Sequence, residues 1–127
     1  MVDYFKRKSV RRRTPKPVAN LLMNMWATVI SCDVNTTNVF KFTKQSDIVI
    51  SATWVPKLIK AEHIKKDAII IDVWFTVLED WKISWDCDFD EIIKTWAKIT
   101  PVPGWVWPMT VAMLMKNTLK AYKQKNK

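Results

Sequence analysis

Short apolar runs alternate with amphipathic segments along this chain. Three runs rich in β-branched residues predict buried strands at 27–32 (ATVISC), 47–51 (DIVIS) and 68–73 (AIIIDV), and a last short strand begins at Ile99. Helical patterns lie at 17–24, 39–45, 60–65, 89–98 and from Pro108 onward. Because strands alternate with helices, the pattern predicts an α/β domain whose mostly parallel sheet is buried on both faces.

The turns carry an unusual composition. The sequence contains one glycine, Gly104, and eight tryptophans, whereas average usage would give about nine glycines in a chain of this length. Asp80-Trp81 lies between two apolar runs, where Asp-Gly would make a tight hairpin turn. Tryptophan has no advantage at a turn that needs positive φ, whereas glycine does. Tryptophan thus stands at positions where turn chemistry favours glycine.

The basic residues gather at the start of the chain. The net charge is +9, but residues 1–16 hold seven basic residues and one acidic residue, which leaves 14 basic and 11 acidic residues elsewhere. We interpret 1–15 as a solvated basic arm and 123–127 as a frayed tail. A basic arm can bind phosphates, but the tryptophans lie at turns without the spacing of a base-stacking surface. We therefore do not expect nucleic-acid binding.

Other functional classes are excluded by what the chain lacks. No apolar run reaches the roughly 18 residues of a membrane helix, and no secretory signal pattern opens the chain. Cys32, Cys87 and His63 have no metal-ligand spacing, so we predict no metal site, reduced cysteines and a cytoplasmic protein. We interpret His63 as a surface helix residue, and the neighbouring acidic residues as turn and helix-cap residues: Asp86, Asp88 and Asp90.

Four segments resemble, in order and spacing, the methylenetetrahydrofolate dehydrogenase/cyclohydrolase family. Residues 99–114 (ITPVPGWVWPMTVAML) are similar to its signature T-P-V-P-G-G-V-G-P-M-T, with Trp105 and Trp107 in place of glycine. The other three are 51–56 (SATWVP), which resembles S-A-T-G-x-P, 71–74 (IDVW), which resembles I-D-V-G, and 80–89 (DWKISWDCDF), which resembles D-G-K-x-x-G-D-x-D-F. The resemblance covers about residues 16–122 and implies a Rossmann-like three-layer NAD(P)-binding domain without the family's N-terminal catalytic domain.

The resemblance also gives a hypothesis for the tryptophans. All eight, including Trp26 and Trp96, align with usual glycine positions of the family. Some bacterial lineages read the codon UGA as glycine, while a common alternative table translates it as tryptophan, so the native residue at all eight positions is expected to be glycine. The start departs differently, since only residues 16–19 (KPVA) match the dinucleotide motif G-R-S-x-x-V-G-x-P-V-A. A frame error or a fragment boundary would explain this, and it puts cofactor binding by the chain as written in doubt.

The implied function is an enzyme of one-carbon metabolism. The family oxidises 5,10-methylenetetrahydrofolate with NADP, NAD being the other possible cofactor, and hydrolyses the methenyl product to 10-formyltetrahydrofolate. Tetrahydrofolate derivatives and, for the full-length protein, a homodimer follow from the same resemblance. The family's catalytic residues lie in the N-terminal domain, so none is assigned here and the isolated chain is expected to be inactive. The alternative is a non-catalytic Rossmann-like module whose basic arm binds nucleic acid or a protein partner.

The resemblance assigns two groups of site residues. The cofactor-binding group comprises Thr53, Trp54, Val55, Phe75 and Thr110. The substrate-cleft loop comprises Pro101, Pro103, Gly104 and Trp105.

Overall fold

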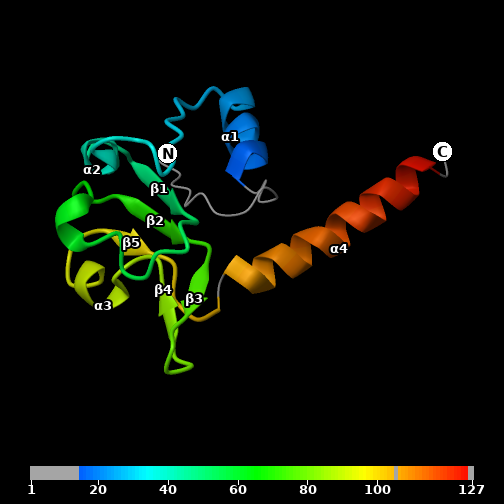
Figure 1. The fold of residues 1–127 in the computed structure, drawn as a ribbon. Coiled ribbons are helices and arrows are strands. Elements are labelled where there is room, and N and C mark those ends of the chain that lie inside the picture. The colour runs from blue at the N-terminus through cyan, green and yellow to red at the C-terminus, as the bar shows by residue number, and fades with distance from the viewer. Residues whose placement is uncertain (1–14, 105, 126–127) are drawn as a thin grey trace.

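The computed structural model describes residues 15–104 and 106–125 (Figure 1). Residues 1–14 of the predicted basic arm, Trp105 and residues 126–127 lie outside this part of the chain. The elements, in chain order, are α1 (Pro15–Asn24), α2 (Val39–Thr43), β1 (Ile48–Ser51), the 3₁₀ helix η1 (Ala61–His63), β2 (Ile69–Asp72), β3 (Phe75–Val77), β4 (Ile83–Trp85), α3 (Phe89–Ile92), β5 (Lys98–Ile99) and α4 (Val106–Lys125).

The strands form two sheets. β1, β2 and β5 make a parallel sheet in that order, with Val49 opposite Ile70 and Ile70 opposite Ile99. β3 and β4 pair antiparallel in a separate hairpin, with Phe75 opposite Trp85. The helices and strands alternate along the chain, which confirms the predicted α/β class with a mostly parallel sheet.

One face of the parallel sheet carries the core. Val49 and Ile70 point to this face and pack with further buried residues, Ile59, Ala68, Cys87 and Ile92. The prediction that both faces are buried was wrong, because Ile48 and Ile69 point the other way and are 40% and 42% exposed. Figure 1 shows the reason: α4 runs away from the sheet, and it has no buried residue.

The strand predicted at 27–32 does not form. This segment has no bridge to a neighbouring strand among the described residues, and a strand needs such a partner for its backbone groups. Cys32 is nevertheless buried and packs against Val39 and Ile30. The prediction of a buried strand was therefore wrong for most of the run, because Ala27, Thr28 and Ser31 are exposed and only Cys32 is buried.

The helix predicted over 89–98 is too long. α3 ends at Ile92, and Thr95 then competes with helical hydrogen bonding. The Thr95 hydroxyl donates to the carbonyl of Ile92 at 2.6 Å and accepts the amide of Ala97 at 3.1 Å. This local pair of hydrogen bonds turns the chain into β5.

Candidate functional site

The loop that follows β1 lies at the carboxyl end of the parallel sheet, where open α/β sheets bind ligands. Thr53 is 1% exposed, so its side chain shapes the loop from within. Its hydroxyl accepts the amide of Val55 at 3.1 Å, and its own amide donates to the carboxylate of Asp86. Trp54 has a φ of 64°, in the left-handed region that favours glycine. These contacts make the loop a tight, internally braced turn.

An aromatic cluster occupies the same end of the sheet: Trp54, Trp74, Phe75, Trp85 and Trp107. The ring centroid of Trp74 lies 4.1 Å from that of Trp54, 5.6 Å from that of Trp107 and 6.0 Å from that of Phe75. Phe75 meets Trp85 edge-on at 5.7 Å. The indole N–H of Trp74 is buried without a hydrogen-bond partner, an arrangement that costs about 1–3 kcal/mol. The two predicted cofactor-binding residues Trp54 and Phe75 thus lie near each other, and the indole of Trp74 packs against both of them.

The predicted substrate-cleft loop leads from β5 into α4. The Val102–Pro103 peptide bond is cis, and Gly104 has a φ of 138°, which side chains rarely adopt. Trp105 lies outside the described residues. The hydroxyl of Thr110 donates to the carbonyl of Val106 at 2.9 Å, within α4. Thr110 is therefore exposed on the helix surface, and its hydroxyl is already engaged with the helix backbone.

Two buried carboxyl groups support the loop. The place of Asp72 at a strand end predicts either a brace for a loop or a ligand contact, whereas the sequence patterns did not predict a bracing role for Asp86. Asp86, interpreted as a turn or cap residue, is 0% exposed; besides the Thr53 amide, its carboxylate accepts the Ser51 hydroxyl at 3.5 Å. Asp72 is 1% exposed and accepts the amide of Cys87 at 2.8 Å. Burial raises the pKa of Asp72 to about 7, with the charge of Asp86 adding to the effect, and burial also raises the pKa of Asp86.

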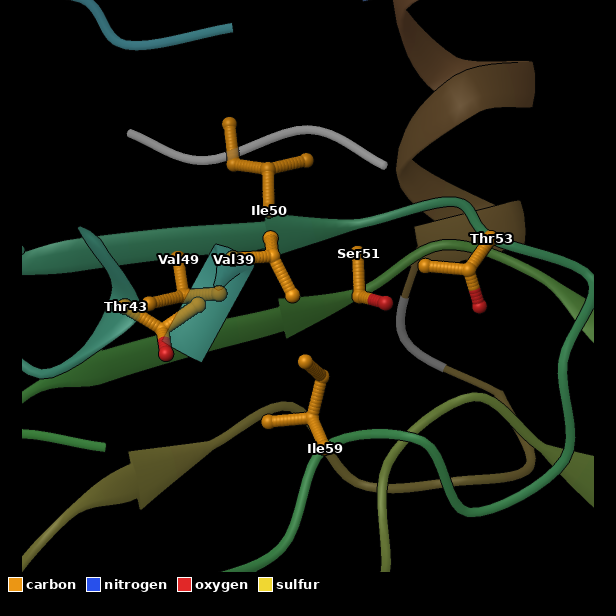
Figure 2. A pocket seen from close by; sticks show the side chains of 7 residues that line it. All are labelled: Val39, Thr43, Val49, Ile50, Ser51, Thr53 and Ile59. Atoms are coloured by element: carbon orange, nitrogen blue, oxygen red, sulfur yellow. The ribbon is translucent and has the colours of Figure 1, made fainter. Parts of the chain in front are cut away.

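A small cavity lies between α2 and β1 (Figure 2), lined by Val39, Thr43, Val49, Ile50, Ser51, Thr53 and Ile59. Its volume is about 10 Å³, counted as room for the centres of water-sized molecules. Ligand pockets usually measure roughly 300–1,000 Å³. The cavity is therefore a gap in core packing and not a place for a dinucleotide.

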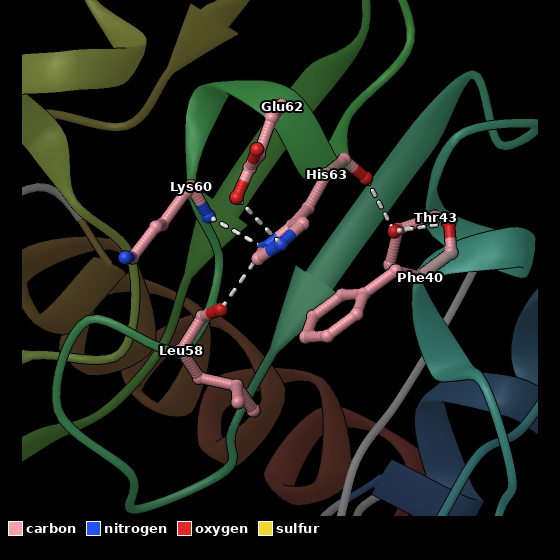
Figure 3. Close-up of polar contacts among 6 residues, drawn as sticks. All are labelled: Phe40, Thr43, Leu58, Lys60, Glu62 and His63. Carbon is pink, nitrogen blue, oxygen red and sulfur yellow. Dashed lines mark hydrogen bonds and ion pairs between the residues drawn. The ribbon is translucent and has the colours of Figure 1, made fainter.

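His63 is not the surface helix residue expected from the sequence (Figure 3). Its side chain is 16% exposed, and its ring stacks on that of Phe40 with centroids 3.6 Å apart. The amide of Lys60 donates to Nδ1 at 3.2 Å, the carbonyl oxygen of Leu58 lies 3.2 Å from the same nitrogen, and Nε2 lies 3.3 Å from the carboxylate of Glu62. Thr43 donates its hydroxyl to the His63 carbonyl. His63 therefore ties η1 to α2 and has a structural role.

The described residues form neither a disulfide nor a metal-ligand group nor a membrane span. Cys32 and Cys87 are buried thiols that form no disulfide with each other. In residues 15–104 and 106–125, no group of three His, Cys, Asp or Glu side chains could hold a metal ion. No helix in the same ranges has the length and apolar character needed to cross a membrane.

Comparison with known proteins identifies a family for this geometry. Residues 12–126 match the family model described as tetrahydrofolate dehydrogenase/cyclohydrolase, NAD(P)-binding domain. The bifunctional protein FolD of Nautilia profundicola is 47% identical over 108 residues, which cover 85% of this chain and 38% of that protein. The chain thus spans well under half the length of the curated relatives it matches.

Two solved structures have the same fold. The bifunctional FolD methylenetetrahydrofolate dehydrogenase/cyclohydrolase of Campylobacter jejuni gives a TM-score of 0.83 at 36% identity, covering 98% of this chain and 43% of that one. The methylenetetrahydrofolate dehydrogenase-cyclohydrolase of Trypanosoma brucei, complexed with NADP cofactor and inhibitor, gives 0.82 at 38% identity, covering 99% and 44%. These matches confirm the predicted Rossmann-like class.

Proposed function

The chain belongs to the tetrahydrofolate dehydrogenase/cyclohydrolase family as its NAD(P)-binding domain, and we propose that it is the cofactor-binding part of a bifunctional one-carbon enzyme. The full-length protein oxidises 5,10-methylenetetrahydrofolate with NADP and hydrolyses the methenyl product to 10-formyltetrahydrofolate. The observation that carries this proposal is the family match over residues 12–126. NADP, when bound, accepts the hydride, and the catalytic residues come from the part of the relatives that this chain does not span.

The braced loop after β1 is the part of this chain that we assign to the cofactor. It presents Trp54 and Val55 at the carboxyl end of the sheet, with Thr53 fixing the turn from inside. A cofactor site needs such a rigid wall, because a loop that moved would not hold a ligand in one orientation. On the resemblance alone we also assign Phe75 and Thr110 to the wall, and Pro101, Pro103 and Gly104 to the side that faces the substrate.

The aromatic cluster does not fit a bound dinucleotide. Trp54, Trp74 and Trp107 pack against one another where the cofactor would lie, so the residues present fill the site. Glycine at these positions would remove the three indoles and bare the backbone at residues 54, 74 and 107, which allows close approach of a ligand. We therefore assign the cofactor site to the glycine form of the chain and derive no step through NADP for the chain as written.

Backbone conformation supports glycine as the native residue at three of the tryptophan positions. Trp26, Trp54 and Trp81 have φ values of 63°, 64° and 63°. A side chain with a Cβ pays about 1–2 kcal/mol in this region, whereas glycine adopts it freely. Trp81 lies in the β3–β4 turn, where its amide donates to the Leu78 carbonyl at 3.0 Å, and its side chain is 87% exposed. Its indole therefore adds little packing to offset the strain.

Peptide mass spectrometry of the protein purified from its own source tests the glycine assignment. The tryptic peptide of residues 99–116 contains Trp105 and Trp107 in the printed sequence. We expect its mass to be lower by two tryptophan-to-glycine differences. The mass of the peptide as printed would overturn the assignment, and the peptide containing Trp26 gives an independent second reading.

The enzymatic proposal is tested by NADPH formation from 5,10-methylenetetrahydrofolate. The full-length protein with glycine at the eight positions should reduce NADP, while the same protein with the eight tryptophans should not. This chain alone, in either form, should be inactive. Turnover by the isolated tryptophan chain would contradict the assignment of catalysis to the missing part. A folded full-length glycine form without activity would contradict the proposed function itself.

Two further features of the full-length protein belong to the same proposal. We propose that it is a homodimer that binds tetrahydrofolate derivatives in the cytoplasm, on the strength of its family alone. Sedimentation analysis of the full-length glycine form should give the mass of two chains, and a monomer would contradict the dimer.

A further inference from the structure

A buried pair of carboxyl groups joins the three segments that meet at the end of the parallel sheet. Asp72 is the last residue of β2, and Asp86 follows β4. The two side chains are 1% and 0% exposed. In each of them one carboxyl oxygen is hydrogen-bonded, while the other, Oδ1, is buried with no partner. Ionised carboxyl oxygens without partners are costly to bury, so this pair requires a physical explanation.

Asp86 reaches across the fold to the loop after β1. Its Oδ2 accepts the amide of Thr53, a residue 33 positions earlier, and also the hydroxyl of Ser51. A carboxylate that accepts a backbone amide fixes that amide more strongly than a neutral acceptor does. The position of Asp86 therefore determines where Thr53, and with it the turn at Trp54, lies.

Asp72 ties the same region to the rest of the sheet. Its Oδ2 accepts the amide of Cys87, which directly follows Asp86, and its own amide donates to the hydroxyl of Thr100 at 3.0 Å. The end of β2, the segment after β4 and the segment after β5 are thus linked through one residue. Asp72 is thus connected to Asp86 through one hydrogen bond and the peptide bond between Asp86 and Cys87.

The charges around the pair explain how it can be stable. The two carboxyls interact with each other and with the thiol of Cys87. Burial raises the pKa of all three groups. Among the described residues no cation is paired with either carboxyl, and the nearby Lys57 bonds Asp88 instead, at 3.0 Å. Two like charges buried together repel, so the pair is most stable when it retains one proton.

We propose that Asp86 is a positioning residue for the loop after β1, and that a single proton held by the Asp72–Asp86 pair controls how firmly it holds that loop. When Asp72 carries the proton, Asp86 stays ionised and binds the Thr53 amide at full strength. Loss of this proton as the pH rises adds a second buried charge and loosens the loop. The inference reaches the cofactor only through the proposed function, since the loop is the assigned cofactor wall.

Nuclear magnetic resonance of this chain tests the proposal without any cofactor. The carboxyl carbons of Asp72 and Asp86 and the amide of Thr53 are followed between pH 5 and pH 9. We expect the Thr53 amide and the Asp72 carboxyl to shift with a common midpoint near neutral pH. Independent titrations, or an Asp72 midpoint near 4 as for an ordinary aspartate, would overturn the shared proton.

Substitutions separate positioning from simple support of the fold. Asp86→Asn keeps an oxygen that can accept the Thr53 amide, but its side chain cannot ionise. The Thr53 amide should therefore stay protected from exchange, while its chemical shift should no longer change with pH. Asp86→Ala should increase its exchange at least tenfold, while exposed Asp90→Asn, as the matched control, should change neither property. An Asp86→Asn chain that keeps the wild-type pH profile of Thr53 would overturn the proposal.

The cofactor consequence is measured separately, in the full-length glycine form. Asp86→Asn should abolish the change in NADP affinity between pH 6 and pH 8 that the unsubstituted protein shows. If neither protein binds NADP, the proposed function fails while the resonance experiment still decides the role of Asp86. If both bind NADP with the same pH dependence, the positioning role fails and the cofactor assignment stands.

Discussion

Replacing Trp26 with glycine should stabilise the domain even though it removes a large side chain. Trp26 follows α1 with a φ of 63°; its amide donates to the carbonyl of Met23, and the amide of Ala27 donates to that of Leu22, both at 3.0 Å. This pair of hydrogen bonds is the Schellman motif, in which the left-handed residue is usually glycine. The Trp26 side chain is 97% exposed, so the chain gains almost no packing from it.

The magnitude follows from three contributions. The left-handed conformation costs a residue with a Cβ about 1–2 kcal/mol. Glycine lowers the free energy of unfolding by about 0.4–1 kcal/mol, because it gives the unfolded chain more conformational freedom. The small unexposed part of the indole contributes at most ~0.2 kcal/mol. The free energy of unfolding should therefore rise by about 0.5–1 kcal/mol, which corresponds to an increase in Tm of about 2–5 °C for a domain of this size.

Denaturant unfolding followed by circular dichroism measures the effect in four variants. Trp26→Gly should be the most stable, Trp26→Asn next because asparagine tolerates the left-handed region, and Trp26→Ala no better than tryptophan. Trp96→Gly is the matched control, since Trp96 is 76% exposed but has no left-handed φ. The strain argument is refuted if Trp26→Ala stabilises as much as Trp26→Gly, or if Trp96→Gly gives the same gain.

Two other predictions concern buried polar groups. Because burial raises the pKa of Asp72 to about 7 in the folded chain from its ordinary value of 3.8, the folded state binds more protons between these values. The free energy of unfolding should therefore fall, by at most ~4 kcal/mol, as the pH rises from 4 to above 7. In urea unfolding at pH 5 and pH 8, Asp72→Asn should remove most of this difference, and its persistence would contradict the reasoning. Thr43→Val removes the donor to the buried carbonyls of Phe40 and His63 and should cost about 1–3 kcal/mol; Thr43→Ser should recover part of that loss, and an unchanged midpoint in the valine variant would show that the bonds add nothing.

Local sequence patterns predicted the elements that rest on local interactions or on a strong β-branched apolar run. The β-branched runs at 47–51 and 68–73 became β1 and β2, and the turn at Asp80-Trp81 became the β3–β4 hairpin. The left-handed φ of Trp81 agrees with the glycine chemistry expected at that turn. At these places the requirement of the backbone can be read directly from residue type and spacing.

The errors arose where distant segments decide the outcome. The run at 27–32 lacks a neighbouring strand in the part of the chain that the structure describes, and Thr95 ends α3 through its own hydrogen bonds. Asp86 looked like a turn residue because its partner, Thr53, lies 33 positions away. A usable signal existed for Asp72, since it lies at the end of an apolar run predicted to be a buried strand, and a carboxyl group there must find partners inside the fold.

Binding of NADP to the full-length protein in two forms tests the central claim most directly. The claim is that the carboxyl end of β1 and β2 is a cofactor site, which the indoles of Trp54, Trp74 and Trp107 fill and glycine opens. Titration calorimetry should give saturable binding of NADP to the form with glycine at the eight positions and no binding to the form with tryptophan. Equal affinity in both forms, or no binding to a folded glycine form, would contradict the account.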